Sequence, residues 1–318
     1  MAFWNKETPD VKAERLRREQ EQEQSQDALE AGKLPLQAER RLREAAGRKD
    51  FFTSDLSVNE HLLLRQAGFE PVGQVMGSAF VQLGWGGMAV GYQQSGELQA
   101  ATQAHLRVRA LAVSRLGQEA EILGAHGVVG VNLELGAYDW SRNVVECTAF
   151  GTAVRRLGSE QRQGPPFTSN LSGQDFWKLH DGGYLPREIA FGTCSYYLHS
   201  DFQTQYALAS NVWGSGRANQ EIVQYTQGFQ HARHLAMTRF TQEVQRCKAQ
   251  GAVGVNVSWH VEEIEYEINE TTYRDLLVHF TALGTAISDS GELSTPSPTL
   301  TFYDLKDRGS FQLLPTEE

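Results

Sequence analysis

An internal duplication is the feature of this sequence that most constrains its fold. Residues 52–78, FTSDLSVNEHLLLRQAGFEPVGQVMGS, align with residues 167–193, FTSNLSGQDFWKLHDGGYLPREIAFGT, at a constant offset of 115. Two further blocks repeat in the same order, at offsets of 124 and 133. The offsets grow because the second copy carries two insertions of nine residues, around 195–230 and 258–280. Repeats in a fixed order predict two structural units of one plan along the chain.

Each copy has the residue pattern of a β-α-β-β unit with a short helix in front. In the first copy Ser57 and Glu60 suit the start of the short helix, and Gly68 suits its end. An apolar strand, a glycine-rich connector and a long helix over about 98–124 follow; the second long helix covers about 218–249. The repeated text GVVGVN or GAVGVN then begins a second strand, and the segment ending in GTAV or GTAI is a third. Such a sheet, covered by one helix, leaves its other face and its edges in need of a partner.

Glycines and helical spacing predict how the long helix meets its sheet. We expect Gly124 to stop the helix, and Gly130 in the following strand to permit close packing of helix on sheet. The predicted buried face of the first long helix consists of positions three or four apart, Leu106, Ala110, Val113 and Gly117.

The chain divides into an arm (1–50), a first unit (51–158), a second unit (166–288) and a tail (289–318). The arm holds 11 basic and 11 acidic residues but few apolar ones, so its helices cannot bury much surface alone. It is interpreted either as a flexible charged arm or as an oligomerisation or docking arm anchored by Phe3 and Trp4. The tail is rich in Ser and Pro before TLTFYDL, which alternates like a short strand and is favoured to extend a sheet edge.

Composition limits the class of protein. An apolar fraction of 40 %, a charged fraction of 21 % and a formal net charge of −10 are typical of a globular protein, and they argue against a nucleic-acid or anionic-membrane surface. No apolar run is long enough for a membrane span, and the first 20 residues lack the apolar core of a secretory signal. Three scattered cysteines fit reduced thiols, so we expect a cytoplasmic protein.

The third repeated block resembles a known family. The text EAEILGAHGVVGVNLE … VECTAFGTAV, with RHLAM … AQGAVGVNVS … HFTALGTAI in the second copy, resembles the YbjQ-type family, whose name associates it with heavy metals. The resemblance covers about 52–157 and 167–287. It implies an α+β fold of two tandem two-layer units with mainly antiparallel sheets, and units that assemble into closed rings, typically of five. The arm, the duplication and the tail depart from the single-domain pattern.

The polar and aromatic positions shared by both copies are the candidates for a binding or interface role. An arginine within a largely apolar helix usually pairs with a carboxylate or a carbonyl, inside the chain or across a subunit interface, and an anion site is the alternative. The tryptophans of the glycine-rich connectors suit a buried or interface aromatic. These candidates are Arg109, Arg233, Asn132, Asn256, Trp85 and Trp213.

Metal binding is a separate hypothesis. His231 and His234 lie three apart on one predicted helix, so both could face one ion. The first copy has Arg107 and Ala110 at the matching positions, and no spacing supports a third ligand. The other interpretation of the pair is two partly exposed helical histidines.

The sequence offers no duplicated catalytic set. It has no nucleophile elbow, no zinc-protease motif and no P-loop lysine, although glycines are abundant before both long helices. The predicted function is therefore a non-enzymatic, oligomeric, ring-forming assembly or binding protein of unknown ligand, with a five-fold ring favoured and a partner for the N-terminal arm. The alternatives are a metal-binding or metal-responsive protein that takes a transition metal, and an enzyme whose site is completed between subunits.

Overall fold

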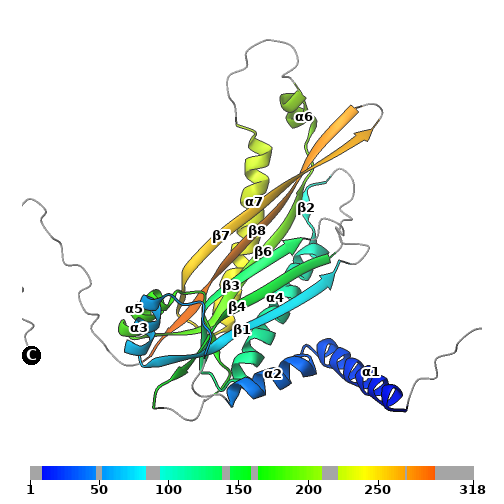
Figure 1. The fold of residues 1–318 in the computed structure, drawn as a ribbon. Helices are drawn as coiled ribbons and strands as arrows, with labels where there is room; N and C mark the ends of the chain where they lie inside the picture. Colours follow the sequence, from blue (N-terminus) through cyan, green and yellow to red (C-terminus); the bar gives the residue numbers. More distant parts are fainter. Residues whose placement is uncertain are drawn as a thin grey trace, which may run out of the picture.

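The two copies form two four-stranded sheets, each with a long helix against one face (Figure 1). The fold is described from a computed structural model of the chain. The residues that it describes are 9–47, 52–83, 94–137, 144–158, 164–209, 221–268 and 271–290.

The first sheet has the strand order β1-β4-β3-β5, and α4 packs on β1 and β4. Pairing is antiparallel except between β3 and β5, which run parallel. The elements are α3 (Val58–Gln66), β1 (Phe69–Gln82), α4 (Gln99–Ile122), β3 (Gly127–Ala137), β4 (Val144–Arg156) and β5 (Phe167–Thr168).

The second sheet has the order β2-β6-β8-β7, is antiparallel throughout, and carries α7 against β6 and β8. The elements are β2 (Gly96–Glu97), α5 (Gly173–Asp181), β6 (Tyr184–Leu198), α6 (Phe202–Ala209), α7 (Val223–Arg246), β7 (Gly251–Ile268) and β8 (Thr271–Asp289). The strand order of β6, β8 and β7 repeats that of β1, β4 and β3, so the predicted α+β fold with two tandem, mainly antiparallel β-α-β-β arrangements is confirmed.

Local signals for the short helices act as predicted. The Ser57 hydroxyl accepts from the backbone N–H of Glu60, whose carboxylate accepts from the N–H of Ser57, a reciprocal capping box. Gly68 follows the helix at φ +79°, a left-handed conformation that glycine adopts without strain. Gly124 ends α4 in the same way at φ +68°, whereas its counterpart after α7 is Lys248 at φ +53°.

The prediction for Gly130 is wrong. A Cβ on Gly130 would meet nothing within 4 Å, so this glycine does not permit a close approach of helix to sheet. Its φ is +65°, and the pairing of β3 with β4 shifts register between Val129 and Asn132. Gly254 has φ +60° at the same register shift between β7 and β8. Both glycines therefore serve a β-bulge with a left-handed residue.

Gly77 on β1 and Gly192 on β6 provide the close approach instead. A Cβ on Gly77 would lie 2.6 Å from the backbone nitrogen of Leu116 and closer still to the carbonyl oxygen of Ala112. A Cβ on Gly192 would meet the backbone of α7 at Ala236 and Phe240 in the same way. Each long helix thus lies directly on a strand glycine.

The predicted buried face of α4 is also wrong, by a rotation about the helix axis. Ala110 is exposed, and the residues that point into the core of the first sheet are Ala104, Val108, Ala112, Leu116 and Ala120. The cause is that α4 lies between the two sheets, so residues on two sides of it are covered. Its N-terminal turns pack on the second sheet, where the Thr102 hydroxyl accepts a hydrogen bond from the Ser195 N–H at 3.0 Å.

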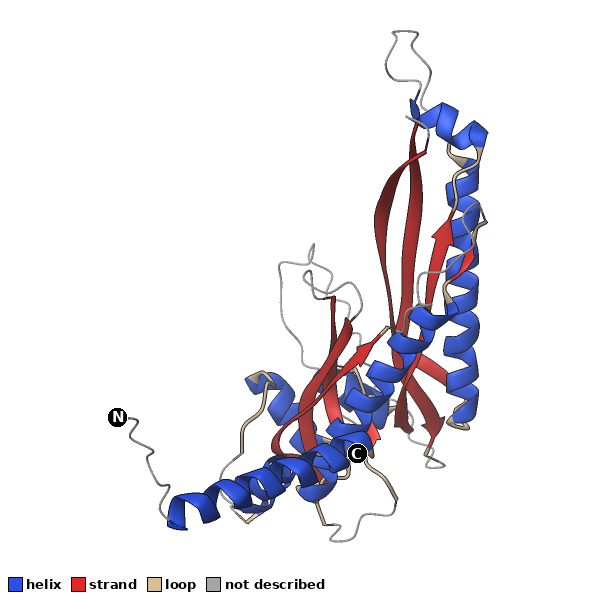
Figure 2. Ribbon diagram, turned by 90° about the vertical axis from the view of Figure 1, so that its right-hand side faces the viewer, coloured by secondary structure: helices blue, strands red, loops and turns tan. Residues whose placement is uncertain are grey.

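The arm has two helices, α1 (Pro9–Glu30) and α2 (Leu36–Ala46), which extend from one end of the molecule (Figure 2). Leu34 and Leu42 are buried in the core of the first sheet, and the Gln118 side chain on α4 holds the turn between the helices through Leu34 N and Gly32 O. Salt bridges within α1 join exposed or half-buried side chains four residues apart, from Arg15, Arg17 and Arg18. The second arm helix is docked on α4, and α1 presents a charged surface.

The second copy differs from the first by a longer hairpin. Strand β7 has 18 residues where β3 has 11, and with β8 it projects beyond the rest of the second sheet (Figure 1). Phe3, Trp4 and the tail from 291 lie outside the described residues. No helix among the described residues is long and apolar enough to cross a membrane.

Candidate functional site

A cleft of about 970 Å³ lies between α4, the beginning of β6 and the chain that leads into β5. Its walls combine apolar side chains with charged ones. The lining includes Leu106, Arg109, Val113, Phe167, Ile189 and Phe191. The predicted helix face of Leu106, Ala110, Val113 and Gly117 faces this cleft, which explains why it is apolar without being buried in the core.

Arg109 is the buried charge of the cleft. Its side chain is 4 % exposed, its guanidinium lies over the ring of Phe191, and its Nε and Nη1 have no hydrogen-bond partner among the described residues. Burial lowers the pKa of Arg109 well below its usual range. The neighbouring Cys147 offers no counter-charge, because burial raises the pKa of its thiol to about 11 and leaves it neutral at pH 7. Within the described part of the chain, Arg109 is thus a buried cation with no paired carboxylate.

The two copies contact each other through a short strand of the second copy that pairs with the sheet of the first. Residues 167–171, at the start of the second copy, run along the edge of β3 in the first sheet. The N–H of Ser169 donates to Val128 O and the N–H of Val131 donates to Ser169 O, each at 2.9 Å. Phe176 of α5 fills a core cluster with Leu64, Phe69 and Val129 of the first copy. The contact joins sheet edge, helix and core.

The family model YbjQ_1, described as "Putative heavy-metal-binding", matches residues 75–156. The Mycobacterium tuberculosis protein named Encapsulin nanocompartment protein Rv1762c is 37 % identical over 259 residues, which are 77 % of this chain and 90 % of that protein. This chain belongs to the YbjQ-like family. No solved structure matches it.

The YbjQ-like chain places its predicted arginine pair in different surroundings. Arg109 is buried, whereas Arg233, at the matching position on α7, is exposed. Asn132 and Asn256 are exposed on β3 and β7, directly after the two bulges. The structure therefore does not bring these four side chains together into one site, and their roles stay predictions.

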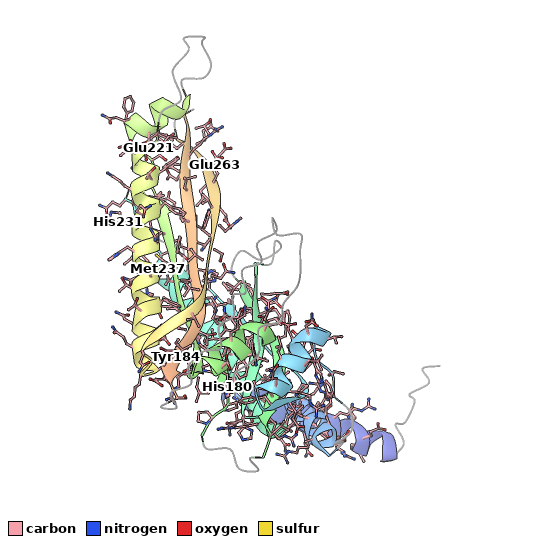
Figure 3. All side chains as sticks on the ribbon, turned by 90° about the vertical axis from the view of Figure 1, so that its left-hand side faces the viewer. His180, Tyr184, Glu221, His231, Met237 and Glu263 are labelled. Carbon is pink, nitrogen blue, oxygen red and sulfur yellow. The ribbon has the colours of Figure 1, made fainter. Side chains whose placement is uncertain are left out.

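The predicted aromatic and metal residues are not assembled into a site either. Trp85 and Trp213 lie outside the described residues. His231 and His234 are exposed on α7 (Figure 3 labels His231), and the His231 ring stacks on Tyr196 at a centroid distance of 6.4 Å. Within the described part of the chain, no three His, Cys, Asp or Glu side chains are grouped as a metal site requires. The metal hypothesis stays a prediction.

A second duplicated arginine pair, which the residue-level prediction missed, makes equivalent contacts in both copies. Arg115 Nη1 donates to Ser78 O at 2.6 Å, and Arg239 Nη1 donates to Thr193 O at 3.0 Å. Arg239 also bonds the carboxylate of Glu97 at 2.8 Å. The signal was available, because residues 115 and 239 match at the same offset of 124 as residues 109 and 233.

A polar cluster surrounds Asp275 in the second copy. The repeat does not match it to residues of the first copy, so the sequence did not indicate it. Asp275 is fully buried and accepts hydrogen bonds from the Tyr197 hydroxyl and the Ser200 N–H, while His199 Nδ1 lies 3.1 Å away. Burial alone would raise the pKa of Asp275, but these hydrogen bonds hold it below its usual range. The cluster fixes the end of β6 to β8, at the base of the projecting hairpin.

Proposed function

We propose that this YbjQ-like protein is a structural subunit that assembles head to tail with copies of itself into a closed ring. Its two units would be 51–158 and 166–288, with the arm and the tail outside them. The name of the Mycobacterium tuberculosis relative, a nanocompartment protein, supports an assembling role. The observation that carries the proposal is that the contact between the two copies has matching, unfilled halves at both ends of the chain.

The first unfilled half is a sheet edge. β7 corresponds to β3 but, among the residues that the structure describes, is the last strand of its sheet. The segment that would fill this edge is 52–56, FTSDL, the counterpart of the FTSNL that pairs with β3. Among the described residues, 52–56 form no strand. An open edge and an unpaired segment of matching sequence support parallel strand addition between copies.

The apolar side chains around this edge agree. Val131 on β3 is 3 % exposed where the donated strand covers it, whereas its counterpart Val255 on β7 is 43 % exposed. Phe69, which packs against Phe176, is 4 % exposed, whereas its counterpart Tyr184 is 40 % exposed. At the other end of the chain Leu62, the counterpart of the packed Trp177, is exposed. The apolar residues that are buried where the two copies meet therefore have exposed counterparts at both ends of the chain, as expected of surfaces that contact another subunit.

The open faces of the two sheets follow the same rule. In the second sheet Phe191 is covered by α4, and Ser195 is fully buried. Their counterparts on β1 in the first sheet, Met76 and Phe80, are 50 % and 55 % exposed. The helix that would cover them is α7 of the preceding copy, which corresponds to α4. Arg233 would then lie over Met76 as Arg109 lies over Phe191.

When every chain contacts the next through the same head-to-tail interface, the chains form a closed ring if the rotation between neighbours divides a full turn evenly. Because each chain supplies two units, a ring of complete chains holds an even number of units. The five-fold ring that the family resemblance favours would therefore contain five chains and ten units. The N-terminal arm, with exposed charges along α1, would remain available to a protein partner.

The test is a pair of substitutions on β7. Val255 and Val261 are both exposed valines, at 43 % and 42 %, but only Val255 lies where the donated strand would pair. A buried, unpaired carboxylate is strongly unfavourable at an interface. Val255→Glu should therefore give monomers in native mass spectrometry, and Val261→Glu should assemble as the wild type does. Equal assembly of both variants, or a monomeric wild type at micromolar concentration, would refute the head-to-tail contact.

The metal alternative keeps one specific observation, the two exposed histidines three residues apart on α7. Elemental analysis of protein purified without a histidine tag tests it. A stoichiometric transition metal that is lost in His231→Ala would establish a metal-binding protein. Less than about a tenth of an equivalent, with none taken up on titration, would remove this alternative. The remaining alternative, an enzyme whose site is completed between subunits, is tested by a structure of the assembly.

A further inference from the structure

The charges that line the cleft beside α4 do not balance. Four arginines and three glutamates line it among the described residues. Arg246 is bound to two of the glutamates, Glu243 at 2.9 Å and Glu188 at 3.2 Å. Arg187 Nε is engaged by the Ser288 hydroxyl at 2.6 Å. Arg109 is the most deeply buried of the four, and its Nε and Nη1 have no hydrogen-bond partner among the described residues.

Among the described residues, no carboxylate pairs with Arg109. The acidic group that interacts electrostatically with Arg109 is the Cys147 thiol. This thiol is neutral at pH 7 because burial raises its pKa to about 11. The adjacent His105 is neutral as well, because burial lowers its pKa to about 4. A buried guanidinium carries a large desolvation cost that an anion offsets when it binds.

We propose that the cleft is a binding site for a small carboxylate with an apolar body. Arg109 would bind the carboxylate group, and the apolar walls formed by Leu106, Val113, Ile189 and Phe191 would cover the hydrocarbon part. A charged group at the floor of a largely apolar cleft fixes the orientation of such a ligand. The volume of about 970 Å³ is large enough for a medium-length carboxylic acid. Because the cleft lies within one chain, the site does not depend on assembly.

Within a single chain, the other copy does not form an equivalent site. The counterpart of Arg109 on α7, Arg233, is exposed within the chain, and the counterpart of Phe191 is Met76. A chain on its own therefore provides one such site, with a matched arginine that lies outside it. The neighbouring Arg107 on α4 is also exposed and supplies a control on the same helix.

Calorimetric titration with octanoate, and with octanamide as an uncharged probe of the same length, tests the proposal on the full chain. The wild type should bind octanoate in this cleft, and octanamide at least about tenfold more weakly, because the amide lacks the charge. Arg109→Met should weaken octanoate binding by at least about tenfold, whereas Arg107→Met should bind it as the wild type does.

The thermal midpoint of the unliganded protein separates a ligand site from a structural ion pair. Removal of an unpaired buried charge should leave the Tm of Arg109→Met equal to or above that of the wild type. Octanoate should then raise the Tm of the wild type and of Arg107→Met only. Absence of octanoate binding, equal binding of octanoate and octanamide, equal binding by Arg109→Met, or a large loss of Tm in Arg109→Met would each overturn the proposal.

Discussion

Arg115 and Arg239 occupy equivalent positions on the two long helices, and each donates a hydrogen bond from Nη1 to a carbonyl oxygen of the strand beneath it, Ser78 or Thr193. The strand carbonyl lies one residue beyond the glycine on which the helix rests, Gly77 or Gly192. The duplicated pair therefore holds helix to sheet at the point of closest approach, in both copies.

Arg239 should contribute more to stability than its exposed neighbour on α7. Arg239→Met removes the bonds to Thr193 O and to Glu97, and leaves the mostly buried Glu97 carboxylate unpaired. We expect the free energy of unfolding to fall by about 2 kcal/mol. Gln242→Met, at an exposed position on the same helix and measured in the same denaturant titration, should change it by less than about 0.5 kcal/mol. A similar loss in both variants would show that the Glu97 pair contributes nothing.

His105 should make stability depend on pH between about 4 and 6.5. Burial lowers the pKa of its imidazole from 6.5 to about 4, and the neighbouring His279 and Arg109 add to the effect. The unfolded chain takes up this proton first as the pH falls, so the contribution is complete above pH 6.5 and is lost progressively down to about pH 4. A shift of this size corresponds to about 3 kcal/mol. Unfolding titrations at several pH values should show a shallower slope in His105→Gln, and an unchanged slope would contradict the assignment.

Gly77 should be irreplaceable for a steric reason. A Cβ there would collide with the backbone of α4 at Ala112 and Leu116, which cannot yield without moving the helix. We expect Gly77→Ala to lower the free energy of unfolding by at least about 2 kcal/mol. Gly117 lies on α4 itself and a Cβ there meets nothing, so Gly117→Ala should raise stability by about 0.5–1 kcal/mol. Comparison of the two midpoints in denaturant decides the matter.

The features that follow from local chemistry could be predicted from the sequence. The duplication, the order of strands and helices, the caps at Ser57 and Ser172 and the turn at Gly68 all depend on residues close together in the chain. The repeated text itself identified equivalent positions, including the pair Arg115 and Arg239 that was not singled out.

The features that depend on tertiary contacts or on local strand geometry could not be predicted from the sequence. The face of α4 was misassigned because helical spacing shows an apolar side but not which of two sheets it meets. Gly130 was misassigned because a strand glycine looks the same at a bulge and at a close contact. Asp275 and His199 are 76 residues apart and lie in a region altered by the insertions, so no repeat links them.

Cysteine cross-linking between copies tests the head-to-tail contact most directly. Within the chain, Thr168 lies opposite Val128 in the parallel pair of β5 and β3. The counterparts are Thr53 and Ala252, which would face each other across two copies. Oxidation of the Thr53→Cys, Ala252→Cys double variant should give a ladder of covalent multimers ending at the mass of the native ring, and neither single variant should give it. A double variant that assembles but stays at the monomer mass after oxidation would contradict the contact.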